Sequence, residues 1–426
     1  MLRFDRSVTT MSTLTTSQSS RDGADLTPRG RLISGPLALL FLSTFGTLTS
    51  FYLLVSVTPM YAASAGAGSA GAGLMTGVLL LGTVAAELAS SFLMRRYGYR
   101  LVLAAGAILL GVPGLALLIH GPLIILVIAS VIRGFGFGLG TVVMGALMAV
   151  LLPADRRGEG LGVFGLADTV PAVIALPSGV WLAGHFGYPV VVIITAVTAL
   201  VPLAACRWLP GRSVARAAPI SDDAGKPTGK PTGLLAGLRH GRLLRPALIF
   251  AASTVAAGVV VSFLPLAAGV SRNVAAVGLL AQALTAAVTH WWAGWHGDRH
   301  GHARLLIPGL VLAALGMITM IWLASPVAVI AGMCLFGAGF GISQNATFVL
   351  MIDRMPASEY GTASAIWSLA YDAGYGAGPA VFGLVASRTG FPAAFALTGA
   401  LMLVVLPACR RERSANVAAA SHNAPR

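Results

Sequence analysis

The chain is 426 residues long, and 56% of its residues are hydrophobic while only 10% are charged. Because soluble globular proteins carry about 25% charged residues, this composition excludes a soluble enzyme, a disordered chain and a collagen-like fibre. The net charge of +14 does not indicate a nucleic-acid partner, because the Lys and Arg residues lie mostly between apolar segments, as in the cytosolic loops of membrane proteins. Cys206, Cys334 and Cys409 are too few and too scattered for a disulfide framework or a metal site.

Twelve apolar runs follow a polar N-terminal segment, residues 1–31, which we expect to be a disordered cytosolic tail. Each run is close to the roughly 20 residues that a membrane-spanning helix needs. The sequence therefore predicts an all-α polytopic membrane protein with twelve transmembrane helices, over residues 33–59, 70–94, 101–119, 123–152, 161–185, 189–208, 246–269, 273–297, 304–325, 327–352, 361–387 and 391–409.

Basic residues occupy alternate connections between these runs. Arg95, Arg96 and Arg100 follow the second run and Arg156 and Arg157 follow the fourth, whereas the connections after the first, third and ninth runs have no Lys or Arg. Since basic loops stay on the cytosolic side, we expect a multi-pass protein of the inner (plasma) membrane with both termini in the cytosol.

The longest connection divides the chain into two halves. Residues 209–245 contain the Pro-, Gly- and Lys-rich stretch GKPTGKPTG, a composition typical of a flexible linker. We therefore expect an N-terminal six-helix bundle over residues 32–208, a C-terminal six-helix bundle over 246–409, and a cytosolic tail over 410–426.

The two halves repeat each other at a constant offset of 203 residues. Loop positions and span positions both obey this offset, which makes coincidence a poor explanation. An even number of spans per unit gives two parallel repeats, one of the ways in which secondary transporters are built. The recurring elements are Arg96-x-Gly98 with Arg299-x-Gly301, GxGFG at 134–138 with 337–341, Pro153-Ala154 with Pro356-Ala357, Gly158 with Gly361, and Gly187 with Gly390.

These motifs resemble the major facilitator superfamily over roughly residues 33–409. The family's Gly-x-x-x-Asp-Arg-x-Gly signature is intact in the second half as Gly294, Asp298, Arg299 and Gly301, whereas the first half reads Ser91, Arg95, Arg96 and Gly98. The resemblance implies a cytosolic gate formed by Gly294, Asp298, Arg299, Gly301, Arg96 and Gly98. The first half has Arg95 in place of the Asp, so two alternatives stay open there: the gate contact forms in this half as well, or it does not. The segments PADRRGEGLG (153–162) and YDAGYGAGP (371–379) resemble the bacterial drug and metabolite exporter branches.

Five ionisable residues fall inside predicted spans: Glu87, Arg133, Asp168, His290 and Asp372. A charge at the bilayer centre costs at least about 2.5–3.5 kcal/mol, so such residues face a cavity or a partner. We expect them to carry proton coupling, a role that the family resemblance also implies for Arg133. The alternatives are structural: Glu87 pairing with Arg95 or Arg96, Arg133 bonding backbone carbonyls, Asp168 bonding at the membrane edge, and His290 bonding at the interface.

Polar and aromatic residues within the later spans are candidates for a substrate cavity, and we select Gln344, Asn345, Trp367 and Tyr371. No catalytic constellation and no nucleotide-binding motif is visible in the sequence, since the Gly-rich runs lie inside apolar spans rather than in a strand–turn–helix context. We therefore expect no cofactor or metal, and an ion gradient as the energy source.

These features predict a secondary transporter that acts by alternating access, in which protons drive efflux of a small drug-like compound or metabolite and the protein works as a monomer. A proton-coupled uptake symporter for a sugar or an organic acid is the alternative of the same class. A membrane sensor that no longer transports is the alternative of a different class, supported only by the degenerate Arg95.

Overall fold

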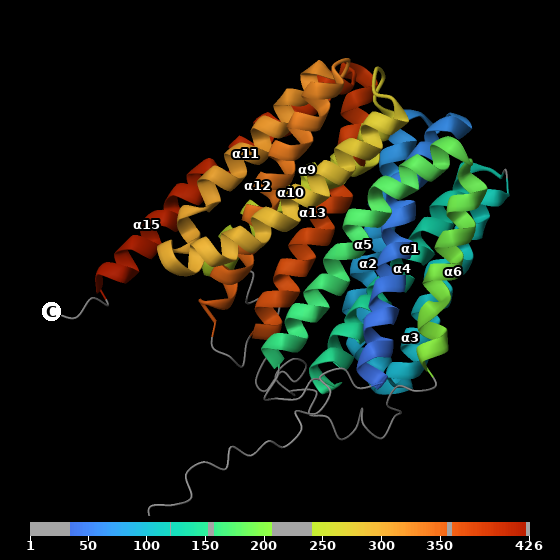
Figure 1. The fold of residues 1–426 in the computed structure, drawn as a ribbon, viewed down its shortest axis with the longest axis horizontal. Coiled ribbons are helices and arrows are strands. Elements are labelled where there is room, and N and C mark those ends of the chain that lie inside the picture. Colours follow the sequence, from blue (N-terminus) through green and yellow to red (C-terminus); the bar gives the residue numbers. More distant parts are fainter. Residues whose placement is uncertain (1–34, 120, 152–156, 207–240, 356–359, 423–426) are drawn as a thin grey trace, which may run out of the picture.

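The computed structural model describes residues 35–119, 121–151, 157–206, 241–355 and 360–422, and every regular element in these ranges is helical (Figure 1). The expected N-terminal tail and most of the expected linker lie outside them. The α-helices are α1 (Gly35–Ala62), α2 (Gly68–Tyr97), α3 (Tyr99–Gly111), α4 (Leu123–Leu151), α5 (Arg157–His185), α6 (Tyr188–Cys206), α9 (Gly241–Phe263), α10 (Arg272–His300), α11 (Leu306–Thr319), α12 (Pro326–Ile352), α13 (Tyr360–Thr389), α14 (Phe391–Leu403) and α15 (Leu406–His422).

Eleven of the twelve predicted spans coincide with one helix or with a helix and its short extension, and the twelfth, 391–409, covers α14 and the first turn of α15. Short 3₁₀ segments extend α3 and α11, and a π-helical turn over Ala63–Ala67 joins α1 to α2. Within the described residues, 9 helical segments are long and apolar enough to cross a membrane, and the first of them, Gly35–Tyr97, contains both α1 and α2. The helices α5 and α13 complete the set, so the prediction of twelve spans agrees with the fold.

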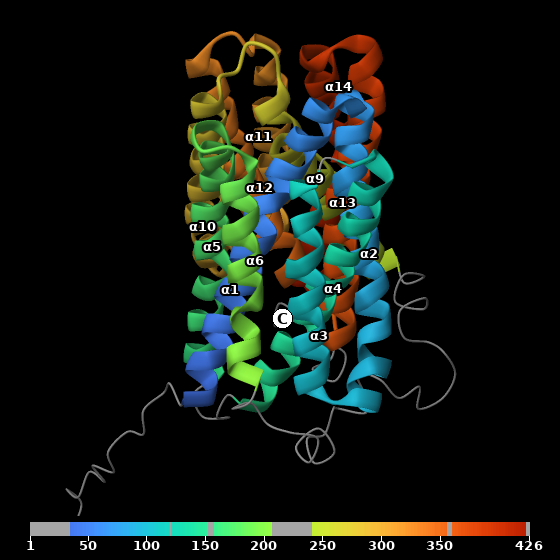
Figure 2. The same cartoon turned by 90° about the vertical axis from the view of Figure 1, so that its right-hand side faces the viewer.

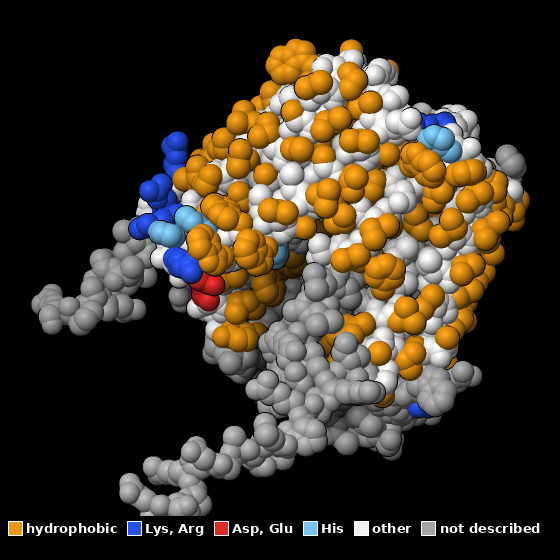
Figure 3. Space-filling model, in the orientation of Figure 1, with side chains coloured by type: hydrophobic (Ala, Val, Ile, Leu, Met, Phe, Trp, Pro, Cys, Tyr) orange, Lys and Arg blue, Asp and Glu red, His pale blue; other side chains and the backbone are white. Residues whose placement is uncertain are grey.

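The outer surface is apolar over most of the face shown in Figure 3, with Lys, Arg and His side chains gathered at its edges. Large hydrophobic side chains are exposed on many helices, including Val327 at 77% and Trp291 at 72%. Because lipid cannot hydrogen-bond the backbone, only structures that satisfy it internally, such as helices, span a bilayer. The surface and the secondary structure thus both indicate a bilayer as solvent.

The 203-residue repeat of the sequence is also a repeat of packing. A methyl group at Gly134 would meet the backbone of Leu79, and one at Gly337 would meet the backbone of Gln282, which is Leu79 shifted by 203. Gly98 and Gly301 end α2 and α10 with positive φ angles of 82° and 90°, a conformation that only glycine adopts readily. The two halves therefore fold as parallel six-helix repeats.

The halves meet along two pairs of helices, α2 with α13 and α5 with α10. They stand side by side in Figure 1, with α1–α6 in blue to green and α9–α14 in yellow to red. We call the end of the bundle with the turns at Gly98 and Gly301 the basic end, since Arg95, Arg96 and Arg299 lie there. The other end, with the α1–α2 connection and the turn at Gly390, is the opposite end (Figure 2).

Candidate functional site

A cavity of about 240 Å³ lies between the two halves. Helices of both halves contribute to its wall, with α10 and α13 facing α1 and α5. The described lining residues are Tyr52, Thr169, Ala172, Val173, Leu176, Ala257, Val261, Gln282, Ala283, Ala286, Ala287, His290, Phe340, Gln344, Tyr371 and Tyr375. The wall is thus mostly aromatic and aliphatic, with a few neutral polar groups, which is usual for a small-molecule site.

Two of the four predicted substrate residues line this cavity, namely Gln344 and Tyr371. Trp367 lies one turn before Tyr371 on α13, where its ring stacks on Phe250 at 4.4 Å and its Nε1 donates to the Thr347 hydroxyl at 3.3 Å. Asn345 is the nearest neighbour of Gly294 on α10 and does not belong to the described lining. Adjacent positions on a helix point in different directions, which separates Asn345 from Gln344.

His290 also lines the cavity, where its side chain hydrogen-bonds with the side chain of Gln344. It stands on the same face of α10 as Gln282, two turns away, with alanines between them. The structure therefore places one of the five predicted proton-coupling residues in the cavity wall itself.

Glu87 and Asp372 meet across the boundary between the halves, and their carboxyl groups hydrogen-bond with each other. The antiparallel packing of α2 and α13 brings them together: Ser69 donates to the carbonyl of Gly383 at 2.9 Å, and a methyl group at Gly376 would contact Leu80. Asp372 is 7% exposed. The alternative pairing of Glu87 with Arg95 or Arg96 is not what this arrangement shows, since both arginines are exposed at the basic end.

A hydrogen bond between two carboxyl groups requires a proton, because an ionised carboxylate has no hydrogen to donate. With both groups ionised, two like charges would face each other in an apolar boundary, which is strongly unfavourable. A hydrogen bond between these two carboxyl groups therefore needs one bound proton.

Arg133 lies inside the first half and does not belong to the described lining of the cavity. It is 1% exposed, and its Nε donates to the carbonyl of Leu110 at 3.1 Å. Its two terminal nitrogens have no hydrogen-bond partner in the described structure. The backbone bond is the structural role considered from the sequence, and no geometry here joins Arg133 to the carboxyl pair.

Asp168 belongs to α5, but its side chain lies outside the described residues. Its neighbour Thr169 lines the cavity.

The residues predicted to form the cytosolic gate lie at the basic end. Asp298 is 76% exposed and stands 3.7 Å from the Nε2 atom of His302, and the Arg299 guanidinium lies 3.9 Å above the ring of Trp295. Both contacts stay within the second half. Arg96 is exposed, while Gly98, Gly294 and Gly301 stand at or near the turns.

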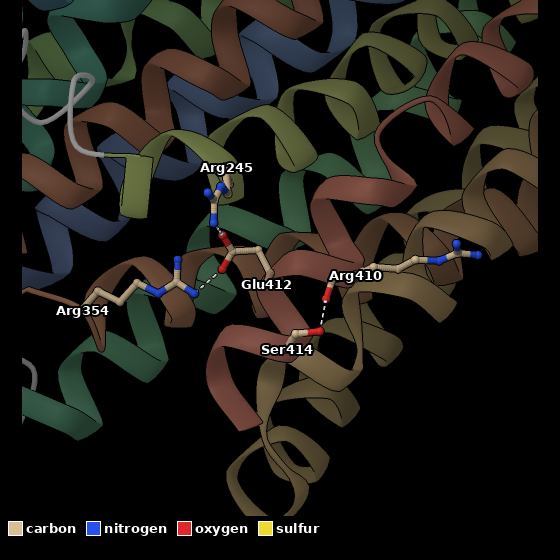
Figure 4. A network of polar contacts seen from close by, with 5 residues as sticks. All are labelled: Arg245, Arg354, Arg410, Glu412 and Ser414. Atoms are coloured by element: carbon tan, nitrogen blue, oxygen red, sulfur yellow. Dashed lines mark hydrogen bonds and ion pairs between the residues drawn. The ribbon is translucent and has the colours of Figure 1, made fainter. Parts of the chain in front are cut away.

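One buried polar cluster was missed by the sequence analysis. Glu412 of α15 is buried between Arg354, which donates a hydrogen bond to it, and Arg245 of α9 at 3.9 Å (Figure 4). This residue falls in the segment 410–426, for which the sequence predicts a cytosolic tail. The alternation of one acid among arginines was the only available signal.

Comparison with known proteins agrees with the fold. The Major Facilitator Superfamily model matches residues 40–374 and 247–424. A D-xylose–proton symporter matches with a TM-score of 0.70 and 19% identity over 87% of this chain and 96% of that one, and the nucleoside transporter NupG with 0.69 and 13% over 89% and 99%. The xylose transporter XylE from E. coli, in a partially occluded inward-open conformation, gives 0.67 and 17% over 87% and 96%. The chain belongs to the Major Facilitator Superfamily and is a membrane transporter rather than an enzyme.

Proposed function

We propose that this transporter couples the movement of a small molecule to the movement of protons, and that it works as a monomer in efflux of a drug-like compound or metabolite. The observation that carries the proposal is the hydrogen-bonded carboxyl pair of Glu87 and Asp372 between the halves. We further propose that the basic end faces the cytosol, because basic residues gather in its connections.

Proton binding at this pair acts on the contact between the halves. When the pair holds a proton, α2 and α13 are joined by a hydrogen bond, and when it holds none, the two carboxylates repel each other. The free energy of the arrangement therefore changes with the proton, which is what a coupling site requires. Glu87 and Asp372 are the proton carriers in this account, and His290 is a second titratable group in contact with the cavity.

Helix α13 connects the proton site to the cavity. Tyr371 and Tyr375 line the cavity, while the adjacent Asp372 and Gly376 face α2. A displacement of α13 against α2 moves both tyrosines, so proton binding and substrate binding act on the same rigid element.

The opposite end holds the halves together in this conformation. Besides the bond from Ser69 to Gly383, the hydroxyls of Thr76 and Ser262 lie 2.9 Å apart, joining α2 to α9. Figure 1 shows α10 and α11 running away from α1 and α5 toward the basic end. The bonds at the opposite end support alternating access, in which the halves separate at one end of the bundle while they stay joined at the other.

Efflux is favoured by the apolar wall of the cavity, which suits loose recognition. Uptake by symport is the second candidate, because Gln282 and Gln344, two of the few amide side chains in the spans, converge on the cavity with three tyrosines. Polar groups of this kind are what a hydroxyl-rich substrate would need.

Proteoliposomes with a trapped pH dye test the proposal. Compounds from a panel of cationic drugs, sugars, organic acids and uncharged aromatic compounds are added outside. Proton release from the vesicles that is lost in Asp372→Asn supports antiport, and proton entry with the compound supports symport. Asp353→Asn, which removes an exposed carboxylate at the basic end, is the matched control and should behave like the wild type. Substrate flux without proton movement would contradict the proposal.

A further inference from the structure

The side chain of Gln282 belongs to the cavity lining and carries a buried acceptor without a partner. The residue is 6% exposed, and its Oε1 atom has no hydrogen-bond partner in the described structure. Burying such an atom without a partner costs on the order of 1–3 kcal/mol, so rotation of the amide toward a ligand N–H or O–H group in the cavity is favoured. The other amide of the wall, Gln344, already has a partner in His290.

The floor of the cavity along α10 is flat and apolar. Ala283, Ala286 and Ala287 lie between Gln282 and His290 on this helix face, and eight residues of α-helix separate these two polar groups by about 12 Å. Because the alanine side chains are small, they leave room above this helix face. A long, thin molecule can therefore lie along it, with Gln282 of the protein at one end and His290 at the other.

Aromatic rings form the wall facing this floor. Tyr371 and Tyr375, one turn apart on α13, are stacked with 5.6 Å between ring centroids and 18° between planes, and Phe340 and Tyr52 are further rings of the lining. Flat rings offer large contact areas to other rings, in offset-stacked or edge-to-face geometry. The wall therefore fits a planar ligand better than a bulky or branched one.

The described wall contains no Asp, Glu, Lys or Arg side chain; His290 is its single titratable group apart from the tyrosines. A permanently charged ligand would lose its hydration here without gaining a counter-charge from the described wall, which is costly. The cavity volume of about 240 Å³ also falls below the 300–1,000 Å³ typical of drug-sized ligands.

We infer that the cavity binds an uncharged, planar aromatic molecule of about two fused rings that carries a hydrogen-bond donor, with the donor on Gln282 Oε1 and the ring between the alanine floor of α10 and the tyrosines of α13. This inference rests on the proposed function for its role in transport, but not for the binding itself.

Calorimetry on the purified full chain in detergent tests the binding with three probes of one shape: 6-hydroxy-2-naphthamide, which is uncharged, 6-hydroxy-2-naphthoate, which is anionic, and 6-hydroxy-2-(aminomethyl)naphthalene, which is cationic. We expect the uncharged probe to bind at least tenfold more tightly than either charged one, and D-xylose to bind more weakly than all three. Gln282→Leu should weaken the uncharged probe tenfold or more.

Two further variants separate binding from folding. Ala287→Leu raises the floor without touching Gln282 and should also weaken binding, whereas Val288→Ala, on the same helix but 63% exposed, should not. Equal or tighter binding of a charged probe or of xylose would overturn the inference, and so would no binding of the uncharged probe to protein that keeps its thermal unfolding transition. Binding of that probe without any proton-linked flux in proteoliposomes would instead refute the proposed function and leave the ligand class standing.

Discussion

The buried ion pairs around Glu412 should hold the C-terminal helix α15 against the second half. Glu412 is 1% exposed, and the Arg354 and Arg245 side chains that contact it are 13% and 46% exposed. Replacing Glu412 with Gln keeps the side-chain volume but removes the negative charge that faces the largely buried Arg354.

The cost follows from these exposures. Removing one partner of a buried ion pair costs about 3–5 kcal/mol, and a solvent-exposed pair contributes only about 0–1 kcal/mol. The Arg354 pair belongs to the first class, while the long, half-exposed contact to Arg245 adds little. We therefore expect Glu412→Gln to destabilise the second half by about 3 kcal/mol, and Asp298→Asn, whose carboxylate is 76% exposed beside His302, by less than about 1 kcal/mol.

Cys409 gives a local readout of this effect, because it is fully buried on α15, close to Glu412. With Cys206 and Cys334 replaced by Ser, the reaction of Cys409 with a thiol-reactive dye during heating reports the opening of α15. At roughly 2–4 °C per kcal/mol for a unit of 150–250 residues, Glu412→Gln should lower the midpoint by about 6–12 °C. Equal midpoints for Glu412→Gln and Asp298→Asn would refute the reasoning.

Two further predictions follow from the packing of the helices. Gly134→Ala places a methyl group against the backbone of Leu79 and should destabilise the first half by about 1–3 kcal/mol. Gly145→Ala, on the same helix with no atom within 4 Å of the added carbon, should be neutral or up to about 1 kcal/mol stabilising. Similar thermal midpoints for the two variants would contradict the close approach of Gly134 to Leu79. A disulfide between Thr76→Cys and Ser262→Cys, whose native hydroxyls lie 2.9 Å apart, should stop transport when oxidised and restore it when reduced, while binding of 6-hydroxy-2-naphthamide persists; unchanged flux in the oxidised protein would show that the opposite end does not open.

The positions of the helices could be predicted from the sequence, because each span has to be apolar over roughly 20 residues whatever it packs against. The repeat could also be predicted, since the motif GxGFG occurs at 134–138 and again at 337–341, and the close helix packing that Gly134 and Gly337 allow recurs with it. The span positions depend on local hydrophobicity and the repeat on a constant spacing, so both can be recognised in the sequence without knowledge of tertiary contacts.

Contacts between the halves could not be predicted in this way. Glu87 and Asp372 were recognised separately as membrane-embedded acids, but which of them face each other depends on the register between α2 and α13. Asn345 and Gln344 are neighbours in sequence, yet only Gln344 lines the cavity, because the rotation of α12 is set by its packing. Gln282 carried no signal apart from being an amide inside an apolar span.

Proton binding at the carboxyl pair of Glu87 and Asp372 should set the distance between the halves, and pulsed electron–electron resonance at several pH values tests this most directly. With the native cysteines removed, spin labels at Leu101→Cys in the first half and Arg304→Cys in the second, both exposed near the basic end, report the distance between the halves. We predict that the distance distribution shifts as the pH is raised and the pair loses its proton. We predict no such shift in Glu87→Gln or Asp372→Asn, where the amide donates a hydrogen bond to the remaining carboxyl group whether or not that group is ionised, and an unaltered shift in Asp353→Asn. A wild-type distance distribution that does not change with pH would show that the carboxyl pair does not control the contact between the halves. Amide variants that respond to pH as the wild type does would show the same.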